Sequence, residues 1–307
     1  MKTRKETLCP APLFGVFALL LAVVPCCAQT GGRVLEGEVP AAVPSADSEA
    51  AASAEVTSDG KPVRAAYFSV EIPEPYVALT FDDGPHPKNT PRLLDLLRER
   101  KVRATFYVVG QNVKEFPLIV RRIAEEGHEI GNHTYTHPNL QRLSDTALRQ
   151  ELEKTRAAIK DAAGVEPLTM RPPYGSFSTR QREWTFKEFG YPAVMWSVDP
   201  LDWKRPGPSV VADRIIKGAS NGAIILAHDL HAQTVDAMPK TLDGLTERGF
   251  RFVTMSQLFA LENRWTRIRE AEARAIQERE AAREAVEIPV PGDSGAGPAS
   301  GSESSGQ

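Results

Sequence analysis

Short apolar runs alternate with amphipathic segments between residues 67 and 262. Each apolar run is typical of a buried strand, and each precedes a segment in which apolar residues repeat at helical spacing. The predicted strands lie at 76–81, 104–109, 128–132, 168–171, 192–198, 223–227 and 250–254. The predicted helices lie at 90–100, 117–126, 145–163, 180–189, 209–217, 236–248 and 256–262.

Seven strand–helix pairs predict an α/β fold, because apolar parallel strands need helices over them. Residue types at the helix ends fit these bounds: Thr90 is expected as an N-cap with Pro91 at the first helical position, Ser144 as a second N-cap, and Gly164 just past a C-terminus. The count and the length favour a distorted (β/α) barrel of about seven parallel strands over an open sheet. We therefore place one domain at 67–262.

The flanking segments differ in composition from this domain. Residues 29–66 and 292–307 are rich in small and polar residues and are expected to be a disordered linker and a disordered tail. Residues 263–291 favour a helix with many charges and only a weak apolar stripe, so a solvated helix is expected there.

The first 28 residues have the layout of a secretory signal peptide. Lys2, Arg4 and Lys5 precede an apolar stretch, and cleavage is expected after Ala28. This pattern predicts an extracytoplasmic location, in the periplasm, the cell envelope or the medium. An uncleaved membrane anchor and a lipoprotein are less favoured alternatives, since the apolar stretch is short and Pro25 fits poorly before a lipidated cysteine.

Charge and cysteine content narrow the chemistry. The net charge of −3 gives no general attraction to nucleic acid. All three cysteines, Cys9, Cys26 and Cys27, lie in or beside the signal segment, so the domain has no thiol to bind a metal. Any metal ion must be held by His, Asp or Glu.

Polar residues follow five of the predicted strands. In a parallel barrel these positions lie at the carboxyl ends of the strands, the face on which active sites are assembled. The residues are Asp82 and Asp83; His133 and His137; Arg171 and Tyr174; Asp199 and Asp202; and His228.

His133 and His137 are four residues apart, so on a helical turn both imidazoles would face one metal ion. This spacing alone is a weak signal, but two histidines and one aspartate make a common three-ligand catalytic set. The third ligand is expected to be Asp83 or Asp82.

The segments "TFDDG", "HTYTH", "RPPYG", "DPLDW" and "ILAH" resemble the five motifs of the polysaccharide deacetylases, also called the NodB-homology domain or carbohydrate esterase family four. They occur in order between Tyr76 and Met255. The resemblance implies that 67–262 is the catalytic domain of this family.

The resemblance also implies a role for each motif residue. Asp83, His133 and His137 would bind the metal, and Asp82 would be the general base with Arg171 keeping it charged. The backbone N–H of Tyr174 would stabilise the oxyanion. His228 would be the general acid, tuned by Asp202, while Trp203, Leu226 and Pro173 would line the substrate pocket.

We therefore expect an exported N-deacetylase that uses one divalent metal ion. Zinc suits the ligands best, with cobalt, nickel or manganese as alternatives. The expected partner is an N-acetylated polysaccharide, peptidoglycan first and chitin-like polymers second; no nucleic acid and no stable protein partner are expected. The alternatives are an O-acetyl esterase acting on xylan and an inactive carbohydrate-binding member of the family.

Overall fold

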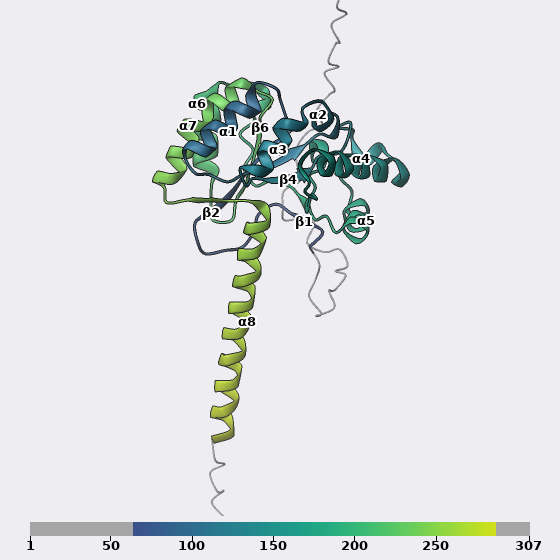
Figure 1. The fold of residues 1–307 in the computed structure, drawn as a ribbon. Helices are drawn as coiled ribbons and strands as arrows, with labels where there is room; N and C mark the ends of the chain where they lie inside the picture. Colours follow the sequence, from purple (N-terminus) through teal and green to yellow (C-terminus); the bar gives the residue numbers. More distant parts are fainter. Residues whose placement is uncertain (1–63, 287–307) are drawn as a thin grey trace, which may run out of the picture. The chain divides into compact units, whose positions relative to one another are not determined.

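The computed structural model describes residues 64–286, which Figure 1 shows in colour. The predicted signal peptide, residues 29–63 of the predicted linker and the predicted tail lie outside the described residues. Within residues 64–286, no helix is both long and apolar enough to cross a membrane. The described part is an α/β fold of parallel strands and surrounding helices, which confirms the predicted class.

A parallel sheet lies at the centre of the fold. Its order is β4 (Glu129–Asn132), β3 (Thr105–Val108), β2 (Tyr76–Asp82) and β6 (Ile224–His228). β7 (Arg251–Val253) pairs with the first residues of β2. β2 thus has neighbours on both sides, and its last residue, Asp82, lies beside the last residue of β6.

Weaker pairings close this sheet into a ring. β5 (Ala193–Val194) pairs with β1 (Ala66–Tyr67), and single bridges join Asn132 to Met170, Met170 to Ala193, and Val198 to Ile225. These bridges lead from β4 back to β6. The result is the distorted barrel that the sequence predicted.

Two predicted strands are much shorter than expected. The strand expected at 168–171 is reduced to the bridge at Met170, and the strand expected at 192–198 to β5 and the bridge at Val198. Pro172 and Pro173 follow Met170 and have no N–H groups, so they cannot continue the pairing with β5. The Arg171 guanidinium instead donates hydrogen bonds to the carbonyl oxygens of Val194 and Met195.

Helices follow the strands, and α1, α6 and α7 pack side by side (Figure 1). Ser144 caps α4 by accepting a hydrogen bond from the N–H of Ala147, and Gly164 ends it with a φ of 71°, both as predicted. The helices are α1 (Asn89–Glu99), α2 (Gly110–Glu115), α3 (Pro117–Glu125), α4 (Asp145–Ala163), α5 (Thr179–Phe189), α6 (Pro208–Gly218), α7 (Ala232–Glu247) and α8 (Met255–Val286). Short 3₁₀ turns lie at Leu140–Arg142, Pro173–Gly175 and Asp202–Lys204.

The predicted start of α1 is wrong. The helix begins at Asn89, and Thr90 lies inside its first turn instead of capping it. His86 does the capping, since its Nδ1 accepts the backbone N–H groups of Lys88 and Asn89. The Thr90 hydroxyl is engaged elsewhere, with the carboxylate group of Asp229.

α7 also begins earlier than predicted, at Ala232 instead of Asp236. Two side chains in its first turn reach Asp202, which begins the 3₁₀ turn before α6. Gln233 donates to the backbone oxygen of Asp202, and Thr234 donates to the Asp202 carboxylate. These tertiary contacts hold a first turn that local sequence does not indicate.

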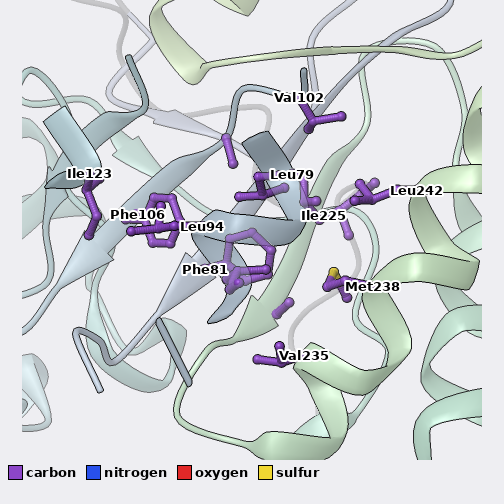
Figure 2. Packing of buried hydrophobic residues seen from close by; sticks show 14 of the residues in the cluster. Leu79, Phe81, Leu94, Val102, Phe106, Ile123, Ile225, Val235, Met238 and Leu242 are labelled. Carbon is purple, nitrogen blue, oxygen red and sulfur yellow. The ribbon is translucent and has the colours of Figure 1, made fainter. Parts of the chain in front are cut away.

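The alternation of side chains along β2 separates two environments. Val77, Leu79 and Phe81 face the helices and belong to the main hydrophobic core, where Phe81 stacks on Phe106 with ring centroids 5.3 Å apart (Figure 2). The intervening residues, Thr80 and Asp82, face the barrel interior, where both contact Arg171. Polar chemistry thus lies on one face of a strand whose other face anchors the core.

α8 is one helix where the sequence predicted two, at 256–262 and 263–291. Its first turns are anchored, since Met255 and Leu258 are fully buried. Residues 271–283 are exposed, as expected for a solvated helix, and 287–291 lie outside the described residues. Because the helix runs through residue 262 without a break, the domain boundary at this point stays a prediction.

Candidate active site

Three potential metal ligands meet at the carboxyl ends of β2 and β4. The Asp83 Oδ1 lies 3.3 Å from His133 Nε2 and 3.1 Å from His137 Nε2. One ligand atom from each of the three residues falls within 4.8 Å of the others. This spacing lets all three atoms reach one cation, and it selects Asp83 over Asp82 as the carboxylate of the set.

The two histidines do not lie on a helical turn, so that part of the prediction is wrong. His133 directly follows β4, and the chain then runs through an irregular loop in which Thr134 and His137 have φ values of 66° and 58°. Side chains fix this loop. Asn132 accepts the N–H of Thr134, and Glu151 of α4 accepts the N–H groups at positions 135 and 136.

The hydrogen bonds of His133 fit a metal ligand. Its Nδ1 lies 2.7 Å from the carbonyl oxygen of Arg171, which can only accept, so Nδ1 carries the proton. In the neutral tautomer that carries this proton, Nε2 has a lone pair on the side of Asp83, where a metal ion would bind. The buried Asp83 Oδ1 has no hydrogen-bond donor in the described part of the chain. The His133 Nε2 and Asp83 Oδ1 atoms thus face each other with no donor between them. A bound cation requires such an arrangement of lone pairs.

The backbone and charge of Asp83 fit the same role. Its φ of 72° lies in the left-handed region, and its carbonyl oxygen accepts a hydrogen bond from the Asn112 side chain. Burial raises the pKa of the Asp83 carboxyl, but when no cation is bound, the His133 and His137 imidazoles with a proton on Nε2 outweigh burial and hold this pKa well below its ordinary value. Asp83 is therefore ionised at neutral pH.

Asp82 and Arg171 form a buried ion pair beside these ligands. Arg171 Nη1 donates to Asp82 Oδ1 at 2.7 Å and to the Thr80 hydroxyl at 2.7 Å. The guanidinium also lies over the ring of Tyr107, 4.3 Å from its centroid. Asp82 Oδ2 is 3.8 Å from His133 Nε2, so this carboxylate faces the metal ligands without joining them.

His228 and Asp202 form a second pair on the other side of β2. His228 Nδ1 lies 2.8 Å from Asp202 Oδ1, and Asp202 Oδ2 accepts the His228 backbone N–H and the Thr234 hydroxyl. Burial lowers the pKa of His228, but the hydrogen bond and the charge of Asp202 outweigh burial and raise it to about 10. The imidazole is thus charged at neutral pH and can donate a proton.

Tyr174 lies beside the metal ligands and is half exposed. Its hydroxyl is 3.2 Å from His137 Nδ1, and its φ of 59° is unusual for a residue other than glycine. Its backbone N–H has no acceptor in the described part of the chain. The preceding Pro173 is buried and begins the 3₁₀ turn that holds Tyr174.

Trp203 and Leu226 lie next to the His228–Asp202 pair along the chain. Leu226 is buried in β6 two residues before His228, on the same face of the strand. Trp203 directly follows Asp202, donates its N–H to the Asp202 carboxylate and is partly exposed. Their contact with an acetyl group stays a prediction.

Sequence reasoning missed two groups near the site. Glu151 positions the loop that carries His137, and Asp229 is a fully buried carboxyl directly after His228. The sequence does contain a signal for Asp229, since it is another titratable residue at the end of a predicted strand. Glu151 had no such signal, because it lies in the middle of a long amphipathic helix.

Known proteins are similar to this chain in sequence and in fold. The family model described as polysaccharide deacetylase matches residues 69–194. The peptidoglycan-N-acetylglucosamine deacetylase PgdA of Listeria monocytogenes serotype 1/2a (strain EGD / Mackaness) is 36% identical over 242 residues, covering 75% of this chain and 51% of the relative. The chain therefore spans about half the length of that protein.

Two further relatives are covered almost completely. A peptidoglycan-N-acetylglucosamine deacetylase of Bacillus cereus (strain ATCC 14579) is 41% identical over 199 residues, which make up 62% of this chain and 92% of the relative. The solved structure of the peptidoglycan deacetylase PdaC from Bacillus subtilis matches with a TM-score of 0.61 and 36% identity, covering 67% of this chain and 98% of that one. The chain belongs to the polysaccharide deacetylase family, also known as carbohydrate esterase family four.

Proposed function

We propose that this protein is an exported, metal-dependent deacetylase that removes acetyl groups from N-acetylated sugars of peptidoglycan. The observation that carries the proposal is the arrangement of three units at one end of the barrel. A His-His-Asp ligand set lies beside a buried Asp82–Arg171 pair and near a charged His228. Metal ligands, a base and an acid are the groups that amide hydrolysis requires.

Asp83, His133 and His137 would hold one divalent cation. When bound, the cation activates water and polarises the acetamide carbonyl group. Two imidazoles and one carboxylate favour zinc, with cobalt, nickel and manganese as alternatives. Metal analysis of protein purified without added ions decides among them.

Asp82 would act as the general base that takes a proton from the attacking water. Arg171 supports this role, because its hydrogen bond to Asp82 Oδ1 keeps the carboxylate in place and its positive charge lies beside it. Asp82 has a second oxygen that does not contact Arg171 and faces His133. This oxygen, Oδ2, is free to accept the proton from the attacking water.

Tyr174 and the nearby apolar residues would receive the acetyl group. The backbone N–H of Tyr174 is an available donor for the negative charge that develops on the carbonyl oxygen. Trp203, Leu226 and Pro173 would enclose the methyl group. A small apolar pocket of this kind would accept acetyl better than longer acyl groups.

His228 would protonate the departing nitrogen. An amine is a poor leaving group without a proton, so amide hydrolysis needs an acid on the leaving side of the carbonyl. Asp202 holds the His228 ring through Nδ1, which leaves Nε2 to donate. The products are acetate and a free amino sugar.

Different observations support the proposed substrate and the proposed location. The Listeria, Bacillus cereus and Bacillus subtilis relatives are all named for peptidoglycan, which is the basis for proposing it here. The charged and apolar pattern of residues 1–28 is the basis for proposing export, which would bring the enzyme to the cell wall.

Acetate release tests the proposal. The purified protein is incubated with peptidoglycan, chitin oligomers and acetylated xylan, with and without added zinc, and Asp82→Asn serves as the inactive control. We expect release from peptidoglycan that requires metal and is absent in the control. Release from xylan alone would make the protein an esterase, and no release from any substrate would favour an inactive carbohydrate-binding member.

A further inference from the structure

Asp229 is a buried carboxyl group at the edge of the site to which the mechanism assigns no task. It follows His228 at the end of β6 and has no exposed surface. One carboxyl oxygen, Oδ2, is hydrogen-bonded to the Thr90 hydroxyl, and Oδ1 has no partner in the described residues. A buried carboxyl with one free oxygen is costly, so its retention calls for a reason.

The carboxyl group of Asp229 packs directly against the turn that follows the two aspartates. A Cβ atom added to Gly84 would lie 2.5 Å from both Asp229 carboxyl oxygens. Only glycine allows this approach. Gly84 is the residue directly after Asp83, so the position of Asp229 limits where the chain can go as it leaves the metal ligand.

Thr90 extends this contact to the rest of the turn. Its hydroxyl oxygen accepts the backbone N–H of His86 at 2.7 Å, and its hydrogen is then directed to Asp229. The chain of bonds runs from His86 through Thr90 to Asp229. It ties the turn after β2 to the end of β6, two segments that are far apart in the sequence.

Other bonds hold the same region from neighbouring elements. The Asn89 side chain donates to the carbonyl oxygen of Leu230, next to Asp229. On the opposite side, Val109 donates its N–H to Gly84, and Asn112 donates to the Asp83 carbonyl oxygen. The turn is therefore held from two directions, and Thr90 with Asp229 supplies the contact on the β6 side.

We infer that Asp229 is a positioning residue, which through Thr90 and Gly84 fixes the turn after Asp83 and so sets the place of this carboxylate opposite His133 and His137. Asp229 touches neither the metal nor the substrate in this account. It links the strand end that carries the base and the metal ligand to the strand end that carries His228. The inference rests on the proposed metal site but not on the identity of the sugar.

The charge state of Asp229 fits this task. Burial and the negative charges of Asp83 and Asp82 raise the pKa of Asp229, the Thr90 hydrogen bond and the charge of His228 lower it, and the net result is a pKa of about 7. Below that pH the carboxyl group is mostly neutral and adds no third negative charge beside the pair. Because only an acceptor for Thr90 is required, an amide can replace the acid.

Zinc affinity of the full-length protein tests the inference, measured by competition with a chromophoric chelator. Thr90→Val keeps the shape of the side chain but removes both hydrogen bonds, and we expect it to weaken zinc binding about tenfold, the lower end of the range for residues that support metal ligands. Thr90→Ser and Asp229→Asn keep the bonds, and we expect zinc dissociation constants within about threefold of the unmodified protein, well below that loss.

A matched control separates positioning from general destabilisation. Thr241 is also fully buried and donates its hydroxyl hydrogen within α7, to Ala237. Thr241→Val should lower the melting temperature about as much as Thr90→Val and leave zinc affinity unchanged. Equal zinc affinity in Thr90→Val and Thr241→Val would overturn the inference, as would a tenfold loss in Asp229→Asn. If no variant, nor the unmodified protein, releases acetate, the proposed function fails while the zinc comparison still stands.

Discussion

The Asp82 carboxylate and the Arg171 guanidinium lie 2.7 Å apart at a place where neither side chain has more than 4% of its surface exposed. Arg171 makes four hydrogen bonds, to Asp82, Thr80 and the carbonyl oxygens of Val194 and Met195. The guanidinium thus connects the end of β2 to the last residue of β5 and the residue that follows it. One residue both closes the barrel and supplies the charge next to the proposed base.

Replacing Arg171 should therefore destabilise the fold. Arg171→Met leaves a buried carboxylate and two carbonyl groups without their donor, and we expect it to lower the free energy of unfolding by about 3–5 kcal/mol. Urea unfolding measures the loss. Arg98→Met is the control, because Arg98 pairs with Asp95 on the surface and its removal should cost no more than about 1 kcal/mol. Equal losses would show that the Arg171 network adds little to stability.

His228→Ala should affect amides far more than activated esters. An amine needs a proton to leave, whereas a 4-nitrophenolate does not. We therefore expect deacetylation of chitin oligomers to fall about 10²–10⁴-fold. Hydrolysis of 4-nitrophenyl acetate should change little in the same variant. Steady-state rates with both substrates make the comparison. A similar fall for both would mean that His228 serves a step before departure of the leaving group.

Asp202→Asn should move the alkaline limb of the pH profile to lower pH. The proton-donating form of His228 is present below its pKa and is lost as pH rises through it. Asp202 is the main group that raises this pKa from 6.5 to about 10, and a cation on Asp83 would offset the smaller contribution of that carboxylate. The limb in kcat/KM should therefore lie above 6.5 and shift toward that value in the variant.

The control for this pH profile is the integrity of the fold in the variant. The amide oxygen introduced by Asp202→Asn would still accept a hydrogen bond from Thr234, so an unchanged circular dichroism spectrum checks that the fold is intact. A lower melting temperature at about pH 6 is expected in any case, because the stabilisation of charged His228 by Asp202 is fully present below the ordinary pKa of histidine. An alkaline limb that does not move, or moves upward, would contradict the pairing of Asp202 with His228 as the source of the shift.

The strand-end residues of the site could be predicted because strand pattern and residue type agree there. Asp82 and Asp83 follow an apolar run, and His228 ends another, so a parallel barrel brings them to one face. Strand pattern left open which of the two aspartates binds the metal, and only the family resemblance pointed to Asp83. Only the distances to His133 and His137 show that Asp83 is the one within reach of both imidazoles.

Local pattern failed where distant side chains determine the backbone. The loop between His133 and His137 is held by Glu151, from a different helix, so helical spacing was the wrong geometry. The same reason explains why Thr90 serves Asp229 and not the helix end. In each case a tertiary hydrogen bond outweighs a local preference.

The neighbouring residues Asp82 and Asp83 have different proposed roles, as general base and as metal ligand, and their asparagine variants separate these roles. Bound metal and acetate release are determined for Asp82→Asn and Asp83→Asn prepared in parallel. We expect Asp82→Asn to retain one metal ion per chain while deacetylation falls at least about 10²–10⁴-fold, and Asp83→Asn to lose the metal ion. Loss of metal in Asp82→Asn with retention in Asp83→Asn would contradict the account.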